Sequence, residues 1–170
     1  MERPKRHGPN RLQNYLQVHT NVMGQMIYNG EVEEDCLDLP NGASGSLLID
    51  GVIWLRDRAL KVTITKTLEV LDDSDPGNPL VQTSSYSYNV SLVGHGNVFR
   101  YCSPHEDGLG IPHHAHHHRH QYEPFGPEPD EYQVTLMTED WPTLQEVIAE
   151  ADAWYLDNLE NVTALNAVRS

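Results

Sequence analysis

The chain has 170 residues, of which 38% are hydrophobic, and this is enough for a single domain with a buried core. Its 25 acidic and 11 basic residues give a net charge of −14, which repels nucleic acid unless salt or a local basic patch offsets it. The apolar runs are far too short to span a bilayer, no signal peptide is visible, and two cysteines make no disulfide framework. These features predict a cytoplasmic protein, and the lysine-poor, acid-rich composition favours a halophilic one.

The first part of the chain is predicted to form one helix after a disordered start. Residues 1–10 are polar, and we expect them to be disordered. Between residues 11 and 27 the apolar side chains recur at a helical spacing. Asn29-Gly30 is a typical end for such a helix.

The middle of the chain is predicted to form antiparallel strands. The apolar runs 47–49 and 52–55 flank Asp50-Gly51, which is a strong signal for a two-residue hairpin turn. Alternating apolar residues predict a strand over 60–71. The segment 81–102 is predicted to be a second hairpin, because a Gly-His-Gly-Asn turn divides it.

The last part of the chain combines a long segment without periodicity and a terminal helix. Residues 105–130 are predicted to be a histidine-rich loop, and a last strand follows around Val134. Thr143 and Glu146 form a capping-box sequence that begins an amphipathic helix. Together, these elements predict one α+β domain over residues 1–170, with its core in residues 43–160. Its antiparallel sheet carries an N-terminal helix and a C-terminal helix packed on one face.

Most of the histidines are concentrated in one short segment. Histidine titrates near neutral pH and is the commonest metal ligand, so this segment is the candidate site. The simplest interpretation of any one histidine in such a run is a solvated surface side chain. Seven of the ten histidines lie here: His105, His113, His114, His116, His117, His118 and His120.

The motifs around this segment resemble those of the TumE family, which comprises toxins of bacterial and archaeal toxin–antitoxin pairs. The resemblance covers residues 86–155, a little under half of the chain. It rests on Tyr86-Ser87-Tyr88, Phe99-Arg100-Tyr101, Pro104-His105, Pro112-His113-His114-Ala115-His116 and the capped terminal helix. One departure is Cys102, which stands where the family pattern has aspartate.

The resemblance implies a toxin that a helix-turn-helix antitoxin neutralises, with RNA as its target. Cleavage of RNA needs a base, an acid and a cation that stabilises the phosphorane charge. His105 and either His114 or His116 are the candidate base and acid, and Arg100 is the candidate phosphate-binding residue. The other candidate residues are Tyr101 for catalysis, and Tyr86, Tyr88 and His113 for substrate binding.

Two other interpretations stay open. The first is a metal site for zinc or another divalent transition metal, with His105, His114 and His116 as ligands and Glu106 or Asp107 nearby. In an extended loop, His114 and His116 would lie on the same side. The second is a partner-binding protein without enzymatic activity, whose acidic surface docks to a basic partner. The sequence is also compatible with a homodimer.

Overall fold

The computed structural model describes residues 7–40, 45–106, 108–125, 131–138 and 140–169. Its strands are β1 (Asn10–Arg11), β2 (Glu34–Asp38), β3 (Ser46–Leu55), β4 (Leu60–Asp72), β5 (Leu80–Leu92), β6 (Gly96–Cys102), β7 (His118–Tyr122) and β8 (Glu131–Leu136). Its helices are α1 (Leu12–Tyr28), α2 (Leu144–Asp157), α3 (Leu159–Arg169) and the single 3₁₀ turn η1 (Pro112–Ala115). The predicted α+β class is confirmed.

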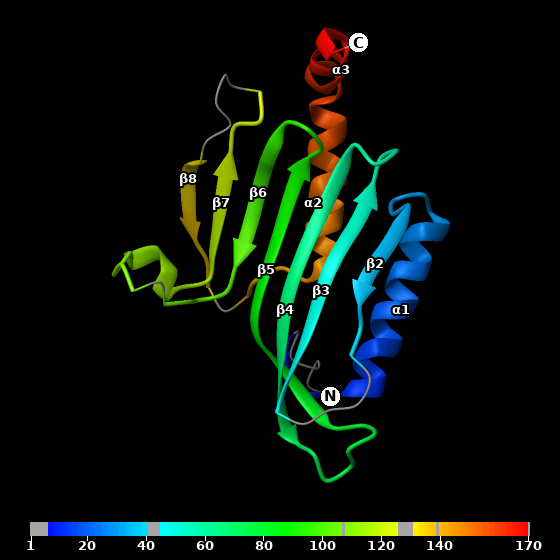
Figure 1. The fold of residues 1–170 in the computed structure, drawn as a ribbon, viewed down its shortest axis with the longest axis vertical. Helices are drawn as coiled ribbons and strands as arrows, with labels where there is room; N and C mark the ends of the chain where they lie inside the picture. The colour runs from blue at the N-terminus through cyan, green and yellow to red at the C-terminus, as the bar shows by residue number, and fades with distance from the viewer. Residues whose placement is uncertain (1–6, 41–44, 107, 126–130, 139, 170) are drawn as a thin grey trace.

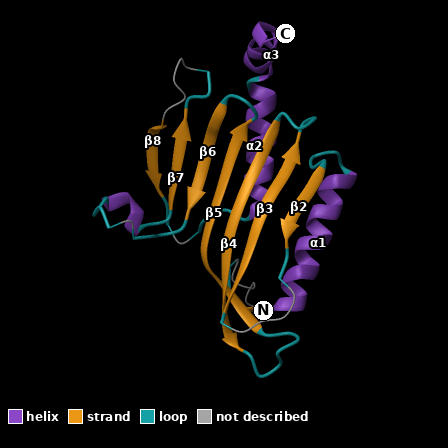
Figure 2. Cartoon of the chain, viewed as in Figure 1, coloured by secondary structure: helices purple, strands orange, loops and turns teal. Residues whose placement is uncertain are grey.

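All of these strands belong to one antiparallel sheet. The order of seven of them is β2-β3-β4-β5-β6-β7-β8, so each of these seven strands pairs with its neighbours in the sequence. The short β1 pairs with the start of β5, opposite Leu80 and Val81. Figure 1 shows α1 and α2 on one side of the sheet. Within the described chain no α-helix covers the other side, as Figure 2 shows.

The hydrophobic core lies between the sheet and the two helices. Met23 and Met26 of α1 and Val147 and Ile148 of α2 contact one cluster of buried strand residues. Burial at alternate positions of β4 and β5 follows the two-residue period of a strand. The intervening side chains point away from the helices, and we call this side of the sheet the open face. Those of β4 and β5 are mostly small and polar: Lys61, Thr63, Thr65, Ser87, Asn89 and Ser91.

Local sequence explains where the helices begin and end. The predicted first helix is confirmed, and it ends just before Asn29 and Gly30, whose φ is 75°. The predicted capping box of α2 is also confirmed, since the Thr143 hydroxyl accepts from the Glu146 N–H and the Glu146 carboxylate accepts from the Thr143 N–H. One terminal helix was expected, but the chain divides into α2 and α3 at Asn158.

The hairpin turn predicted at Asp50-Gly51 is wrong, because β3 runs through both residues without a break. Gly51 pairs with Leu37 of β2 on one side and with Ile64 of β4 on the other. Its φ is 142°, and a Cβ there would lie 2.3 Å from the carbonyl oxygen of Cys36. The glycine therefore permits the close approach of β2 and does not form a turn.

The turn between β3 and β4 lies five residues later. Arg56, Asp57 and Arg58 all have positive φ, near 54°, 52° and 60°, which is costly for residues with a Cβ. The Glu33 carboxylate accepts from the backbone N–H groups of Asp57 and Arg58. Arg56 forms a bidentate ion pair with Asp152 of α2. These contacts from outside the hairpin offset the cost of its backbone conformation.

We expect Gly51→Ala to lower the free energy of unfolding by about 2 kcal/mol, through the clash with Cys36 and the strained φ. Gly24→Ala is the matched control, because a Cβ added there, in the middle of α1, would meet no atom within 4 Å. That change should raise stability by up to about 1 kcal/mol. Urea denaturation of the three proteins measures both effects, and equal stability of the Gly51→Ala variant and the wild type would contradict this role.

Two segments predicted to lack structure contain ordered parts. Strand β7 lies inside the predicted loop 105–130, of which residues 107 and 126–130 lie outside the described residues. Hydrophobic periodicity misses β7 because its own side chains are mostly polar or charged on both faces. Of the predicted disordered segment 1–10, residues 1–6 lie outside the described ones. His7, however, stacks on Trp141 at 3.4 Å, and Asn10 begins β1.

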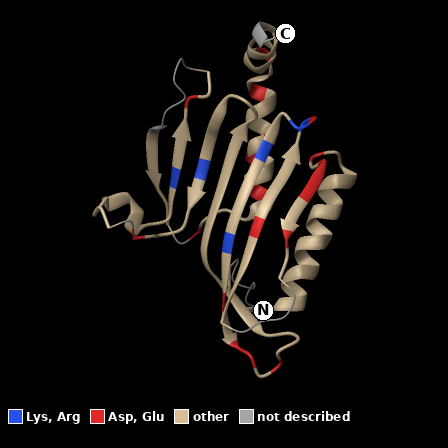
Figure 3. Ribbon diagram, in the orientation of Figure 1, with Lys and Arg blue, Asp and Glu red and all other residues tan. Residues whose placement is uncertain are grey.

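The distribution of charge follows the architecture. Figure 3 shows acidic residues at β2, in the loop between β4 and β5 and along α2, while Lys and Arg lie on β4, β6 and β7 and in the turn between β3 and β4. The basic residues of the sheet are thus spread over separate strands and a turn. Among the described residues, none of the helices combines the length and the apolar character that crossing a membrane requires.

Candidate metal centre

The register of β6 and β7 gathers polar side chains on the open face. Cys102 pairs with His118, and Arg100 pairs with His120. Because alternate strand residues share a face, these four side chains lie together on the side away from the helices. Arg119, between the two histidines, points the other way and binds Glu150 of α2 at 2.8 Å.

The chain after β6 folds back and adds more histidines to this place. The His105 N–H donates to the His114 carbonyl at 2.8 Å, and this bond brings η1 beside the end of β6. Five imidazole rings, called the histidine cluster below, gather around the His118 position: His105, His113, His114, His118 and His120. The ring centroids of His105, His113, His114 and His120 lie 5.3, 5.4, 5.5 and 4.7 Å from that of His118.

His118 is the central residue of the cluster. Its side chain is fully buried, and Nδ1 lies 2.7 Å from the carbonyl oxygen of His116. Since a carbonyl oxygen can only accept, Nδ1 carries the proton and Nε2 presents a lone pair. That Nε2 is buried and has no hydrogen-bond partner among the described residues. Burial lowers the pKa of His118 to about 4, so the ring is neutral at pH 7 and available as a ligand.

His105 is oriented in the same way. Its Nδ1 lies 3.0 Å from the carbonyl oxygen of Ser103, which fixes the proton on Nδ1 and leaves Nε2 as the acceptor. Imidazoles that bind metals usually donate their other N–H to a carbonyl or a carboxylate, which orients the ring. His105 and His118 both have this support before any metal binds.

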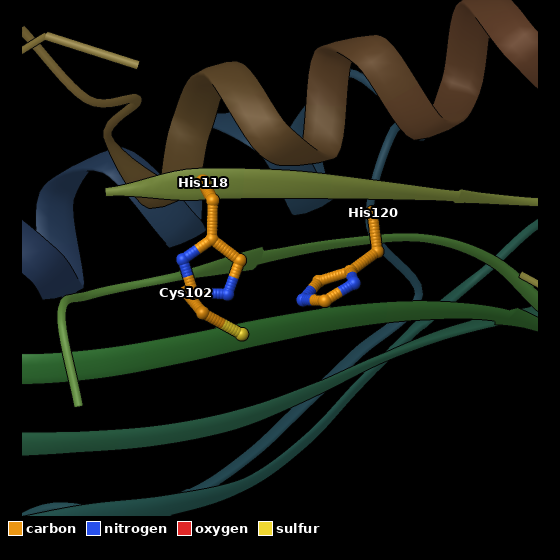
Figure 4. A group of neighbouring side chains, drawn as sticks. All are labelled: Cys102, His118 and His120. Atoms are coloured by element: carbon orange, nitrogen blue, oxygen red, sulfur yellow. The ribbon is translucent and has the colours of Figure 1, made fainter. Parts of the chain in front are cut away.

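Two groups of side chains have the composition and spacing of metal ligands, and both contain His118. One consists of His105, His114 and His118, and the other of Cys102, His118 and His120, with ligand atoms within 4.8 Å of one another in each group. Figure 4 shows the second group, whose side chains point toward one another from β6 and β7. Nitrogen ligands about 2.0–2.1 Å from a tetrahedral zinc lie about 3.4 Å apart, so either group needs a contraction of at most about 1.5 Å.

The surroundings favour the group of three histidines. Nη2 of Arg100 lies 3.2 Å from Nε2 of His120, so the guanidinium donates to that nitrogen and places a positive charge beside the second group. A dication there would be repelled. Cys102 and His120 are also buried, whereas His105 is exposed and His114 is half-buried. The group His105, His114 and His118 is therefore reachable from solvent.

The structure brings together only some of the residues that the sequence predicts for the site. Arg100, His105, His113 and His114 lie in or beside the histidine cluster. His116, a predicted ligand, is exposed and belongs to neither group of ligands. Its contribution is the backbone carbonyl that orients His118. The extended loop assumed for His114 and His116 is wrong, because η1 turns the chain there.

The three predicted tyrosines lie on the helix side of the sheet. Tyr88 is buried in the core, and the Tyr101 hydroxyl donates to Glu150 at 2.7 Å. The Tyr86 hydroxyl lies 3.1 Å from Nδ1 of His117, and its ring stacks on Trp141 at 4.2 Å. The strands therefore separate these side chains from the histidine cluster, which lies on the open face.

The sequence prediction missed His118, His120 and Cys102 as site residues. A signal for the first two was present, since histidines two residues apart in a strand share a face. No local signal places Cys102 beside them, because that contact depends on the pairing of β6 with β7. Comparison of the chain with family models, with curated proteins and with solved structures finds no match.

Proposed function

We propose that this protein binds one divalent transition metal ion, preferably zinc, through Nε2 of His118 together with His105 and His114. The observation that carries the proposal is the buried Nε2 of His118, which has no hydrogen-bond partner among the described residues and has other imidazoles around it. A buried polar atom without a partner costs about 1–3 kcal/mol, and a metal bond would remove that cost. Imidazole ligands suit zinc, copper, nickel and iron.

Three histidines leave one coordination position open. Zinc sites with three protein ligands and a water in the fourth position are typical of hydrolytic enzymes, because the ion lowers the pKa of the bound water to about 7. The exposure of His105 gives solvent access to that position. We therefore propose metal-assisted hydrolysis as the reaction class for this centre.

The metal content of the purified, untagged protein tests the proposal. We expect close to one equivalent of metal in the wild type and almost none in His118→Ala. The matched control is His116→Ala, which removes an exposed ring from the same segment but keeps the backbone carbonyl that orients His118. His105→Ala serves as a second variant, because His105 is exposed and its loss should not disturb folding. Equal metal content in all four proteins, or none in the wild type, would contradict the proposal.

A TumE-like ribonuclease is the second candidate function, and we propose it because Arg100 lies beside the histidine cluster. Arg100 would bind the scissile phosphate, while His105 and His114 would act as base and acid without a metal. A cognate antitoxin would then be the partner. Expression without a partner should arrest host growth, and His105→Ala should relieve the arrest. Normal growth with the wild-type protein would contradict this candidate.

A further inference from the structure

Lys66 lies on the helix side of the sheet, among residues of the hydrophobic core. It follows Ile64 at the next helix-facing position of β4, and its Nζ is 4.9 Å from the centre of the Tyr15 ring of α1. Within the described part of the chain, the side chain of Lys66 makes no hydrogen bond and no ion pair. Burial lowers its pKa to about 8, so the side chain is still mainly charged at pH 7.

This lysine lines a pocket of about 550 Å³ between α1 and the sheet. The volume is in the range of sites for small molecules. Much of the lining is apolar, and the apolar residues on the α1 side are Tyr15, Val18, Val22 and Met23. A ligand of this pocket would therefore need a substantial hydrocarbon part.

The pocket lacks a negative charge of its own. Among the described lining residues none is Asp or Glu, although the chain has 25 acidic residues. His19, which also lines the pocket, already has a partner, since its Nε2 lies 2.9 Å from the Asp35 carboxylate. The Lys66 ammonium is thus a half-buried cation for which the described lining supplies no anion, and a charge that is partly removed from water is costly without a partner.

We propose that this pocket binds a small apolar molecule that carries one carboxylate. The carboxylate oxygens accept from the Lys66 ammonium, and the hydrocarbon part lies against the apolar residues of α1. Pairing in this partly desolvated place is stronger than at the surface. The site is separate from the histidine cluster, which lies on the opposite face of the sheet, and it does not depend on a bound metal.

Decanoate is a suitable probe, and calorimetric titration at pH 7 measures its binding. We expect saturable one-to-one binding to the wild type and at least a tenfold loss of affinity in Lys66→Met, which keeps an apolar side chain of similar length. Lys61→Met is the matched control, because Lys61 is on the same strand but points to the open face. It should bind decanoate like the wild type.

Decanol, which lacks the charge, should bind equally to the wild type and to Lys66→Met. Circular dichroism establishes that each variant is folded. Absence of saturable decanoate binding to the wild type would overturn the proposal. Wild-type affinity in Lys66→Met, or loss of binding in Lys61→Met alone, would overturn it as well, because the carboxylate would then not pair with Lys66.

Discussion

Zinc at a free concentration a thousand times its dissociation constant is expected to raise the free energy of unfolding by about 4 kcal/mol. The reason is linkage: His105, His114 and His118 converge only in the folded chain, because η1 and β7 bring them together. The unfolded chain keeps the histidines of the run 113–120 but not this arrangement, so the metal binds the folded state more tightly, and about 4 kcal/mol is the upper value of the gain. Urea denaturation of chelator-treated protein, with and without added zinc, measures the difference.

Two variants show which group of ligands is responsible for the zinc-dependent gain in the free energy of unfolding. His105→Ala should abolish the zinc-dependent gain, while Cys102→Ser should keep it, because Cys102 belongs to the other group. Cys102 is buried beside Ser87, with 3.9 Å between Sγ and the hydroxyl oxygen, so serine is a close replacement. The opposite pattern, with the gain lost only in Cys102→Ser, would place the ion between β6 and β7.

Lys66→Met is expected to raise the free energy of unfolding at pH 7 by about 3 kcal/mol. Burial lowers the pKa of Lys66 to about 8 in the folded protein, against about 10.5 for the free side chain. Each pKa unit corresponds to 1.36 kcal/mol, so the lower pKa in the folded protein destabilises the folded state by about 3 kcal/mol at pH 7, where the amine is charged in the unfolded chain. Methionine is apolar and fits the same space without the cost.

The pH dependence of this gain follows from the two pKa values. Above about pH 10.5 the amine is neutral in both states, so wild type and variant should differ little. As the pH falls toward 8, the unfolded chain takes up a proton and the folded protein does not. The wild type then loses stability relative to the variant, and the difference is constant below about pH 8. A gain that does not change between pH 7 and pH 10.5 would contradict this explanation.

The elements that were predicted correctly are those with one buried face. In β4 and β5 the apolar residues alternate because every second side chain enters the core, and in α1 they recur at a helical spacing for the same reason. Strand β7 has no such pattern, since His118 and His120 fill one face while Arg119 and Gln121 fill the other. Hydrophobic periodicity therefore cannot reveal it.

Asp50-Gly51 illustrates a different limit of prediction from the local sequence. A glycine after an aspartate is typical of a hairpin turn, but it is equally suited to a strand that a neighbour approaches closely. Only the position of β2, whose Cys36 carbonyl occupies the space of a Cβ, decides between the two. That contact joins two separate strands and is not visible in the local sequence.

The candidate site was predicted in its segment but not in its ligands. The density of histidines indicated the place, and His105 and His114 were predicted as metal ligands. His116 was included because an extended chain was assumed, but the turn at 112–115 and the pairing of β7 with β6 place His118 at the centre instead. The choice among neighbouring histidines thus depends on tertiary structure.

X-ray absorption at the zinc edge of the zinc-loaded protein tests the central claim most directly. If His105, His114 and His118 hold the ion, the spectrum should contain a nitrogen or oxygen shell at about 2.0–2.1 Å, imidazole outer-shell scattering and no sulfur. A sulfur shell at about 2.3 Å would instead identify Cys102 as a ligand. That result, or a spectrum without imidazole scattering, would contradict the three-histidine centre.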